Sequence, residues 1–267
     1  MAKRASRAAE PKPTTTEVVG VVHPLGSGGG RGGKETLWTL RFSFSVWRRK
    51  GGAVDERQLR VARPGLTDKA LRAMMDRVNP YDILRVRVRL TEPAAGAPDA
   101  ELVTLHGPVT SDAELTARAD QLRQPVTVDH PYFGTLTLDR ALNWYAVTAP
   151  WNGRPVQLFL ARNGCDDEEE LFAAAQALWE RQKSWDRRVR VFAAAEMLDL
   201  KNGLWLGDDE TAFTRTRFKA KMTPESVSVS AGGRFEFTFD DGNLFWGHVI
   251  QVSGTLAEGP EHAGIAG

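Results

Sequence analysis

The stretch FEFTFDDGNLFWGHVI, residues 235–250, decides how the C-terminal part of the chain is expected to fold. The Asp241-Gly242 dipeptide at its centre favours a two-residue type I′ turn, because both central positions of that turn need a positive φ. Residues paired directly across the two strands of such a hairpin share one face of the sheet. The predicted register pairs Phe239 with Leu244, Phe237 with Trp246 and Phe235 with His248. We therefore expect one buried face that carries every aromatic ring of the stretch except Phe245.

This predicted hairpin keeps the acidic residues away from the histidine. Asp240 and Asp241 lie at the turn, where their side chains can accept hydrogen bonds from nearby backbone amides. His248 lies further along the ladder, and a strand rises about 3.4 Å per residue, so Asp241 and His248 are too far apart for an acid–base pair. We interpret His248 as a core or half-buried histidine. A hydrolase site that includes His248 and Asp241 remains an alternative.

The rest of the second half, residues 129–267, has the pattern of an α+β domain. Asn152-Gly153 predicts another tight hairpin. Residues 166–203 recur at helical spacing, with acidic residues in the first turn, where the helix dipole favours them. This stretch is either one long helix or two helices broken near Ser184, a residue that can cap the second one, and we favour the break. The predicted architecture is an antiparallel sheet covered by long helices.

The first half, residues 17–128, is predicted to form a small β domain with one embedded helix. Residues 35–47 alternate apolar and polar side chains, as a half-buried strand does. Thr67 is placed to cap the helix. Strand, strand, strand, helix, strand, strand is the order of an OB-like Greek-key barrel, which is the fold we predict here. Residues 1–16 are interpreted as a disordered basic tail.

Composition limits the classes of function. The chain of 267 residues has 35 Lys and Arg against 34 Asp and Glu, a net charge of +1 that suggests no general attraction to nucleic acid or membrane. Its apolar runs are shorter than the roughly 20 residues of a membrane-spanning helix, and no secretory signal is recognised. The single cysteine, Cys165, excludes an internal disulfide. These features favour a cytoplasmic protein without a membrane partner.

Several motifs resemble functional sites without the context that those sites need. The glycine-rich segment 26–33 contains G-x-G-x-x-G, but the predicted strand that follows offers no helix N-terminus for a phosphate. We interpret this segment as a mobile hairpin loop. The five histidines are scattered singly, without the spacing of metal ligands. No cofactor, metal site or catalytic residue is predicted, and the chain is expected not to be an enzyme.

Nucleic-acid binding has support from basic residues in the first half. In LRVRVRL, residues 84–90, the valines are expected to face inward and the three arginines outward as a basic stripe. Proteins that bind single strands combine a cationic groove with exposed aromatic rings that stack on bases. A solvated strand face explains the same alternation. The candidate nucleic-acid-binding residues are Arg85, Arg87, Arg89, Trp47 and Arg49.

The second half resembles a known bacterial family. The stretches YFGTLTLDR, NWYAVTAPWNG, LWERQKSWDRRVRVFAAAEMLDLKNGLW and FEFTFDDGNLFWGHVIQVSGTLAEGPEHAGIAG are similar to the family catalogued as domain of unknown function 2262. The resemblance covers residues 132–267, and DGNLFWGHVIQVSG is its most specific part. It implies a bacterial, soluble α+β protein, without an assigned activity, cofactor or catalytic residue.

The sequence therefore predicts a non-catalytic binding or interaction protein of the bacterial cytoplasm. The similarity to domains found beside toxin and immunity genes implies an immunity-type or regulatory module whose partner is another protein. Single-stranded nucleic-acid binding through the OB-like domain is the first alternative. A hydrolase with a site near His248 is the second.

Overall fold

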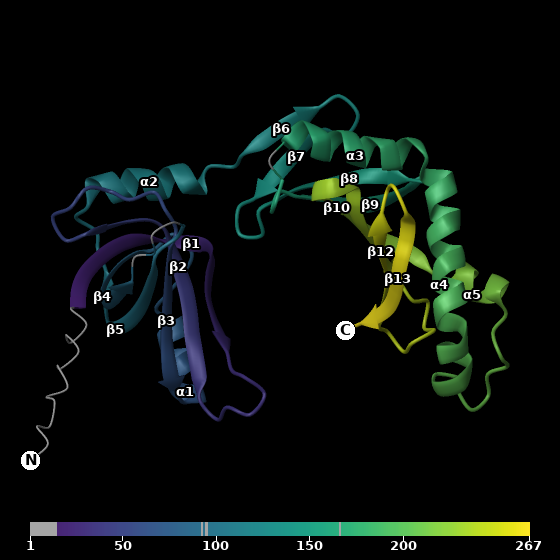
Figure 1. The fold of residues 1–267 in the computed structure, drawn as a ribbon, viewed down its shortest axis with the longest axis horizontal. Helices are drawn as coiled ribbons and strands as arrows, with labels where there is room; N and C mark the ends of the chain where they lie inside the picture. Colours follow the sequence, from purple (N-terminus) through teal and green to yellow (C-terminus); the bar gives the residue numbers. More distant parts are fainter. Residues whose placement is uncertain (1–14, 92, 94–95, 166) are drawn as a thin grey trace, which may run out of the picture. The chain divides into compact units, whose positions relative to one another are not determined.

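The computed structural model describes residues 15–91, 93, 96–165 and 167–267, which form two compact units, Met1–Gln124 and Pro125–Gly267 (Figure 1). Residues 1–14 of the predicted tail lie outside the described residues. Thr15 and Thr16, which the prediction also assigned to the tail, begin the first strand instead.

Five strands of the first unit pair in the order β1-β2-β3-β5-β4, and β4 pairs back onto β1 to close the sheet. Only the β3–β5 pair is parallel. Most of the apolar side chains of these strands form one core together with Leu71 of the short helix. The elements are β1 (Thr15–Gly30), β2 (Trp38–Arg49), β3 (Leu59–Leu66), α1 (Asp68–Met75), β4 (Ile83–Thr91), β5 (Asp99–Pro108) and α2 (Ala113–Arg123).

The glycine-rich segment is mostly strand, which corrects its interpretation as a mobile loop. β1 continues to Gly30, and Gly28 to Gly30 pair with residues 39–41 of β2. A side chain at Gly29 would overlap Leu71, which is buried, so a glycine is needed for α1 to approach the strand. Thr67 caps α1 as predicted, because its hydroxyl accepts a hydrogen bond from the Ala70 amide at 3.3 Å.

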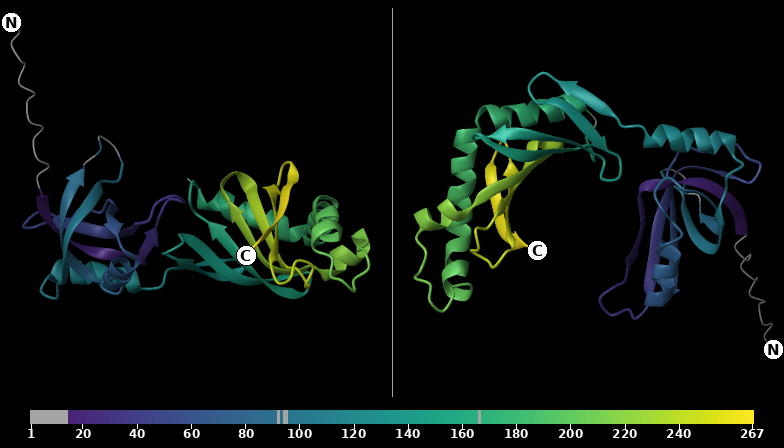
Figure 2. Two further views of the ribbon diagram at one scale, coloured as in Figure 1. Left: turned by 90° about the horizontal axis from the view of Figure 1, so that it is seen from below. Right: turned by 180° about the vertical axis from the view of Figure 1, so that it is seen from behind.

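The second unit is built on one open, twisted sheet of eight strands, ordered from β6 to β13 in chain order (Figure 2). The β9–β10 pair is parallel, and the other pairs are antiparallel. Its strands are β6 (Thr127–His130), β7 (Gly134–Asp139), β8 (Trp144–Trp151), β9 (Arg154–Ala161), β10 (Thr223–Ser230), β11 (Arg234–Asp240), β12 (Val249–Thr255) and β13 (Gly259–Ala266). Its helices are α3 (Glu168–Glu180), α4 (Gln182–Leu204), α5 (Arg215–Lys221) and the 3-10 turn η1 (Ala231–Gly233).

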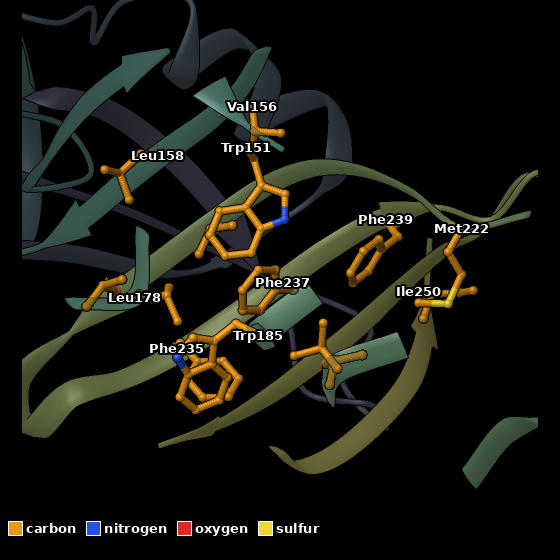
Figure 3. Packing of buried hydrophobic residues seen from close by; sticks show 14 of the residues in the cluster. Trp151, Val156, Leu158, Leu178, Trp185, Met222, Phe235, Phe237, Phe239 and Ile250 are labelled. Atoms are coloured by element: carbon orange, nitrogen blue, oxygen red, sulfur yellow. The ribbon is translucent and has the colours of Figure 1, made fainter. Parts of the chain in front are cut away.

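Aromatic rings dominate the core of this unit. Phe235, Phe237 and Phe239 project from one face of β11, where they meet Trp151 of β8 and Trp185 of α4 (Figure 3). The ring centroids of Trp151 and Phe237 are 5.2 Å apart, and those of Trp185 and Phe235 are 5.1 Å apart, both edge to face. The prediction that these three phenylalanines are buried is confirmed.

The predicted fold class is wrong. The chain is 45% strand and 26% helix, and its second unit is an open sheet of eight strands instead of an antiparallel sheet covered by long helices. The second unit has an open mixed sheet, because the chain leaves β9, forms three helices and returns in β10 parallel to β9. The long α4 lies against β12, β13, α3 and α5, and its Trp185 also packs on Phe235 of β11.

The predicted register of the last hairpin is also wrong. β11 pairs with β12 so that Phe239 faces Ile250 and Phe237 faces Val252. Residues 241–248 form a loop instead of a two-residue turn. In that loop Phe245 is fully buried and Trp246 is 62% exposed, the reverse of the predicted faces.

Two local predictions in this unit agree better with the structure. Asn152 and Gly153 both have a positive φ, at 49° and 82°, and join β8 directly to β9 as a tight turn. The long helical stretch breaks at Arg181, three residues before the predicted Ser184, and Arg181 makes no side-chain cap.

Candidate functional site

A groove of about 960 Å³ crosses the strands of the first unit. Cavities of this size are typical of ligand sites. Its walls come from the second part of β1, the middle of β2, the start of β3 and the start of β5. The lining residues are Leu25, Gly26, Ser27, Gly28, Arg41, Phe42, Ser43, Gln58, Arg60, Val61, Ala62, Asp99 and Ala100.

The groove is hollow because small residues flank a long one. Arg41 of β2 pairs with Gly28 of β1 on one side and with Ala62 of β3 on the other. Residues paired across strands share a face, so the Arg41 side chain stands between two positions that carry little or no side chain. A Cβ at Gly28 would meet nothing within 4 Å.

Polar pairs lie along the same surface. Gln58 donates a hydrogen bond to the Ser43 hydroxyl at 2.8 Å. The Arg60 guanidinium donates two hydrogen bonds to the Asp99 carboxylate, at 2.8 and 2.9 Å. Both charged groups of that pair are more than half exposed, so they can exchange this partner for a ligand at small cost.

Arg41 is the cation that the groove leaves without a counter-ion. Within the part of the chain that the structure describes, its exposed guanidinium makes no ion pair and no hydrogen bond to a protein group. The residue was not among the predicted candidates. Its alternation with Phe42 and Phe44 indicated an outward side chain, but only the pairing with Gly28 and Ala62 shows that it lies in a hollow.

The predicted arginine stripe lies on β4, which contributes nothing to the groove. Arg85 and Arg87 are exposed, and Arg89 is half-buried. The carboxylate of Glu17 lies 3.7 Å from Arg85, and that of Glu101 lies 2.8 Å from Arg89. Two of the three positive charges are therefore balanced by neighbouring strands.

Trp47 is placed where it cannot stack on a base. Its ring is 2% exposed, and its indole N–H donates to the Arg57 carbonyl at 2.9 Å. Trp47 and Arg49 line a smaller cavity of about 230 Å³ together with Asp55 and Arg57. The hydrogen bond from Arg57 lowers the pKa of the Asp55 carboxyl.

Asp241 and His248 are not joined as an acid–base pair. Asp241 is buried, and its carboxylate accepts hydrogen bonds from the amides of Asn243 at 2.9 Å and Phe245 at 2.5 Å. His248 is half-buried, and its ring lies edge to face against Trp205, 5.4 Å away. Over residues 15–91, 93, 96–165 and 167–267, no cluster of three His, Cys, Asp or Glu side chains could hold a metal ion.

The near-zero net charge of the whole chain hides a strong division between its two units. Residues 1–124 contain 21 Lys and Arg against 14 Asp and Glu, a net charge of +7. Residues 125–267 contain 14 against 20, a net charge of −6. The conclusion that the charge of +1 argues against a polyanionic ligand therefore does not hold for the first unit taken alone.

Comparison with known proteins places the chain in a class of bacterial proteins that are built from domains of unknown function. It belongs to the family described as "Uncharacterized protein conserved in bacteria (DUF2262)", whose model matches residues 130–265. This match confirms the resemblance noted for the second half. The model "Domain of unknown function (DUF7021)" matches residues 4–122. None of the curated proteins matches the chain.

Among solved structures, the chain is similar to the crystal structure of a small single-stranded DNA-binding protein from Streptomyces coelicolor. The identity is 14% and the TM-score 0.28, over 39% of this chain and 100% of that chain. This TM-score is too low for the similarity to bear on function. None of the described helices is both long enough and apolar enough to cross a membrane.

Proposed function

We propose that the chain is a non-catalytic binding protein whose first unit takes a single-stranded nucleic acid in the groove around Arg41. The observation that carries this proposal is a guanidinium without a counter-ion, in a hollow with an apolar floor, on a unit with a net charge of +7. A phosphate supplies the charge that Arg41 lacks, and a net positive domain attracts a polyanion from a distance.

The remaining groups of the groove fit the other parts of a nucleotide. Ala62 and the exposed Leu25 offer apolar surface to a base or a sugar. The amide of Gln58 and the hydroxyl of Ser43 can each donate and accept hydrogen bonds at a base edge. The groove itself has no exposed aromatic ring, so contacts to phosphates are expected to dominate, with little preference for sequence.

Two other readings of the sequence receive less support. A protein partner for the first unit would have to match the same excess of positive charge, which a nucleic acid does with every phosphate. The hydrolase alternative needs an acid–base pair at Asp241 and His248, and the Asp241 carboxylate is already engaged by two backbone amides.

Fluorescence anisotropy with a labelled oligothymidylate, repeated across salt concentrations, tests the proposal. The wild-type chain is expected to bind with an affinity that falls as salt rises, because phosphate contacts release counter-ions. R41A is expected to weaken binding several-fold and to reduce the slope against the logarithm of the salt concentration by about one. A labelled duplex of the same length is expected to bind less tightly.

R89A is the matched control, because Arg89 is on the same unit but outside the groove and paired with Glu101. It removes the same charge from the unit and is expected to leave the affinity nearly unchanged. Equal losses in R41A and R89A, or binding that does not depend on salt, would remove the groove from consideration.

A further inference from the structure

The Arg41 side chain does not lie over the residue that faces it on β1. That residue is Gly28, and a Cβ at Gly28 would meet nothing within 4 Å. A Cβ at Gly30 would instead lie 2.6 Å from the Nη1 atom of Arg41 and 3.9 Å from its Cζ atom. The guanidinium therefore lies over Gly30, the diagonal neighbour that a long side chain can reach across a pair of strands.

Gly30 leaves open the space that this guanidinium occupies. Two non-bonded atoms 2.6 Å apart overlap, so a Cβ at position 30 would displace the end of the Arg41 side chain. The displaced group is the end of a flexible chain with several rotatable bonds, so it can move without disturbing the core. The φ of Gly30 is not in the left-handed region, so alanine fits this backbone. The main effect of a side chain here is therefore on the direction of Arg41.

The observed direction takes the guanidinium away from the acid of the groove. Gly30 pairs with Thr39, which precedes Arg41 by two residues on β2. The Asp99 carboxylate belongs to the row of paired residues on the other side of Arg41, because Arg60, which binds it, pairs two residues after Arg41. Arg41 thus leans away from this carboxylate and stays available to an anion from solution.

The loop that follows Gly30 does not bring an excess of acid to this end of the groove. It contains two exposed bases, Arg31 and Lys34, and one exposed acid, Glu35. The Glu35 carboxylate accepts a hydrogen bond from a backbone amide of the same loop, at 3.0 Å. Within the described part of the chain, residues 28–30 pair with β2 alone, so the guanidinium lies on a strand with a free edge. A phosphate can approach it there through a region of net positive charge.

We propose that Gly30 is a positioning residue of the nucleic-acid site, which directs the Arg41 guanidinium toward the β1–β2 loop so that a phosphate of the bound strand lies at this end of the groove. This proposal rests on the function proposed above for the groove. A guanidinium binds a phosphate most strongly through two parallel N–H groups in a fixed geometry. A side chain at position 30 would misalign these donors without removing their charge.

Anisotropy with the labelled oligothymidylate, measured on the full chain, compares G30A with R41A. G30A is expected to weaken binding about threefold, because the bidentate geometry is lost. It is expected to keep the salt dependence of the wild type, since the positive charge remains, whereas R41A reduces that dependence. In the R41A background, G30A is expected to have no further effect, because the group that it displaces is absent.

G33A is the matched control. It makes the same substitution in the same glycine-rich hairpin, at an exposed position where the new Cβ would meet nothing within 4 Å and where φ is not in the left-handed region. G33A is expected to bind the oligonucleotide as the wild type does. Thermal unfolding of both variants verifies that each is folded.

A second measurement needs no nucleic acid. The Nε–Hε resonance of Arg41 in the ¹⁵N-labelled chain is identified by its absence in R41A. This resonance is expected to shift in G30A, because the guanidinium moves, and to keep its position in G33A.

The outcomes distinguish the role of Gly30 from the function of the groove. If the wild-type chain does not bind the oligonucleotide, the proposed function is wrong and no phosphate site remains at Gly30. If R41A weakens binding and G30A does not, only the role of Gly30 is wrong. An unmoved Arg41 resonance in G30A, or an equal loss from G30A with and without Arg41, also overturns that role. A loss in G30A that disappears in the R41A background supports it.

Discussion

Two turn dipeptides of the second unit, Asn152-Gly153 and Asp241-Gly242, look alike in the sequence and behave differently in the structure. In the first, the two residues of the dipeptide alone join β8 to β9, as the type I′ preference predicts. The second begins a longer loop, and β12 starts only at Val249. The local preference for a type I′ turn therefore decides the conformation only where burial of a nearby side chain does not stabilise a different loop more strongly.

The side chain that changes the outcome is Phe245. A two-residue turn at 241 and 242 would direct Phe245 to the solvent face of the sheet. The observed loop instead buries it completely against Trp205 and Phe218. Complete burial of a phenylalanine is worth about 1.5–3 kcal/mol, more than one turn preference supplies. Near Asn152-Gly153 the flanking residues are already paired in the ladder, so no such competition arises.

The largest effect is expected from F245A. Removal of a fully buried ring is expected to lower the free energy of unfolding by about 3–5 kcal/mol, because a cavity remains beside Trp205 and Phe218. W246A, one residue away, is expected to change it by less than about 0.5 kcal/mol, since that ring is mostly exposed. Urea denaturation followed by far-UV circular dichroism measures both. Equal destabilisation would mean that Phe245 does not select the loop.

The two turn glycines provide the next comparison. G242A is expected to cost about 3 kcal/mol, because the alanine Cβ would lie 2.5 Å from the Lys221 carbonyl and φ is +55°. G153A has no atom within 4 Å of its new Cβ, so only the positive φ opposes it, at about 1–2 kcal/mol. Thermal unfolding of G242A and G153A in the same buffer shows which of the two variants loses more stability. A larger loss in G153A would contradict the packing of α5 against the loop.

The two aspartates at the second turn, the buried Asp241 and the exposed Asp240, provide the third comparison. D241N is expected to cost about 2 kcal/mol, because an amide group supplies only one oxygen for the two backbone N–H groups that the carboxylate now satisfies. D240N serves as its control, since Asp240 is exposed and accepts a hydrogen bond from Gly242 alone. Its expected change is within about 0.5 kcal/mol. Chemical denaturation of D241N and D240N measures this difference in stability, whether or not either variant alters binding.

The smallest effect is expected from W246G, and its sign is opposite. Glycine adopts a φ of +57° without steric cost, so the variant is expected to gain about 0.5–1 kcal/mol in stability. N152G, at a φ of +49°, is expected to gain less, because asparagine tolerates this region better than tryptophan. A destabilised W246G would show that Trp246 contributes to packing.

Much of the local structure could be predicted because it depends on a few neighbouring residues. The N-cap at Thr67, the turn at Asn152-Gly153 and the burial of Phe235, Phe237 and Phe239 are confirmed. The strand through the glycine-rich segment 26–30 was missed, because local flexibility argued for a loop. Close packing of Leu71 against Gly29, and pairing with β2, order it instead.

The candidate site residues also show that the sequence pattern predicts the direction of a side chain but does not predict which residues of other strands lie beside it. Alternation predicted that Arg85 and Arg87 are exposed, as the structure shows. The sequence does not reveal that Glu17 lies beside Arg85 and Glu101 beside Arg89, because these acids come from other strands. Trp47 breaks the alternation of β2 and is buried. Arg41 has the same pattern as any polar residue of a strand, and its position in the groove depends on Gly28 and Ala62 across the sheet.

By itself, the sequence determined most of the strand and helix segments, the membership of the second half in its bacterial family, and the charge of each half. These follow from periodicity, residue preference and composition, which act within a few residues or add over many. The tertiary structure alone decided the register after Asp241, the exposure of Trp246 and the hollow around Arg41. Each of these results from burial or pairing between residues distant in the chain, and the free energy of such contacts exceeds the local preferences that oppose them.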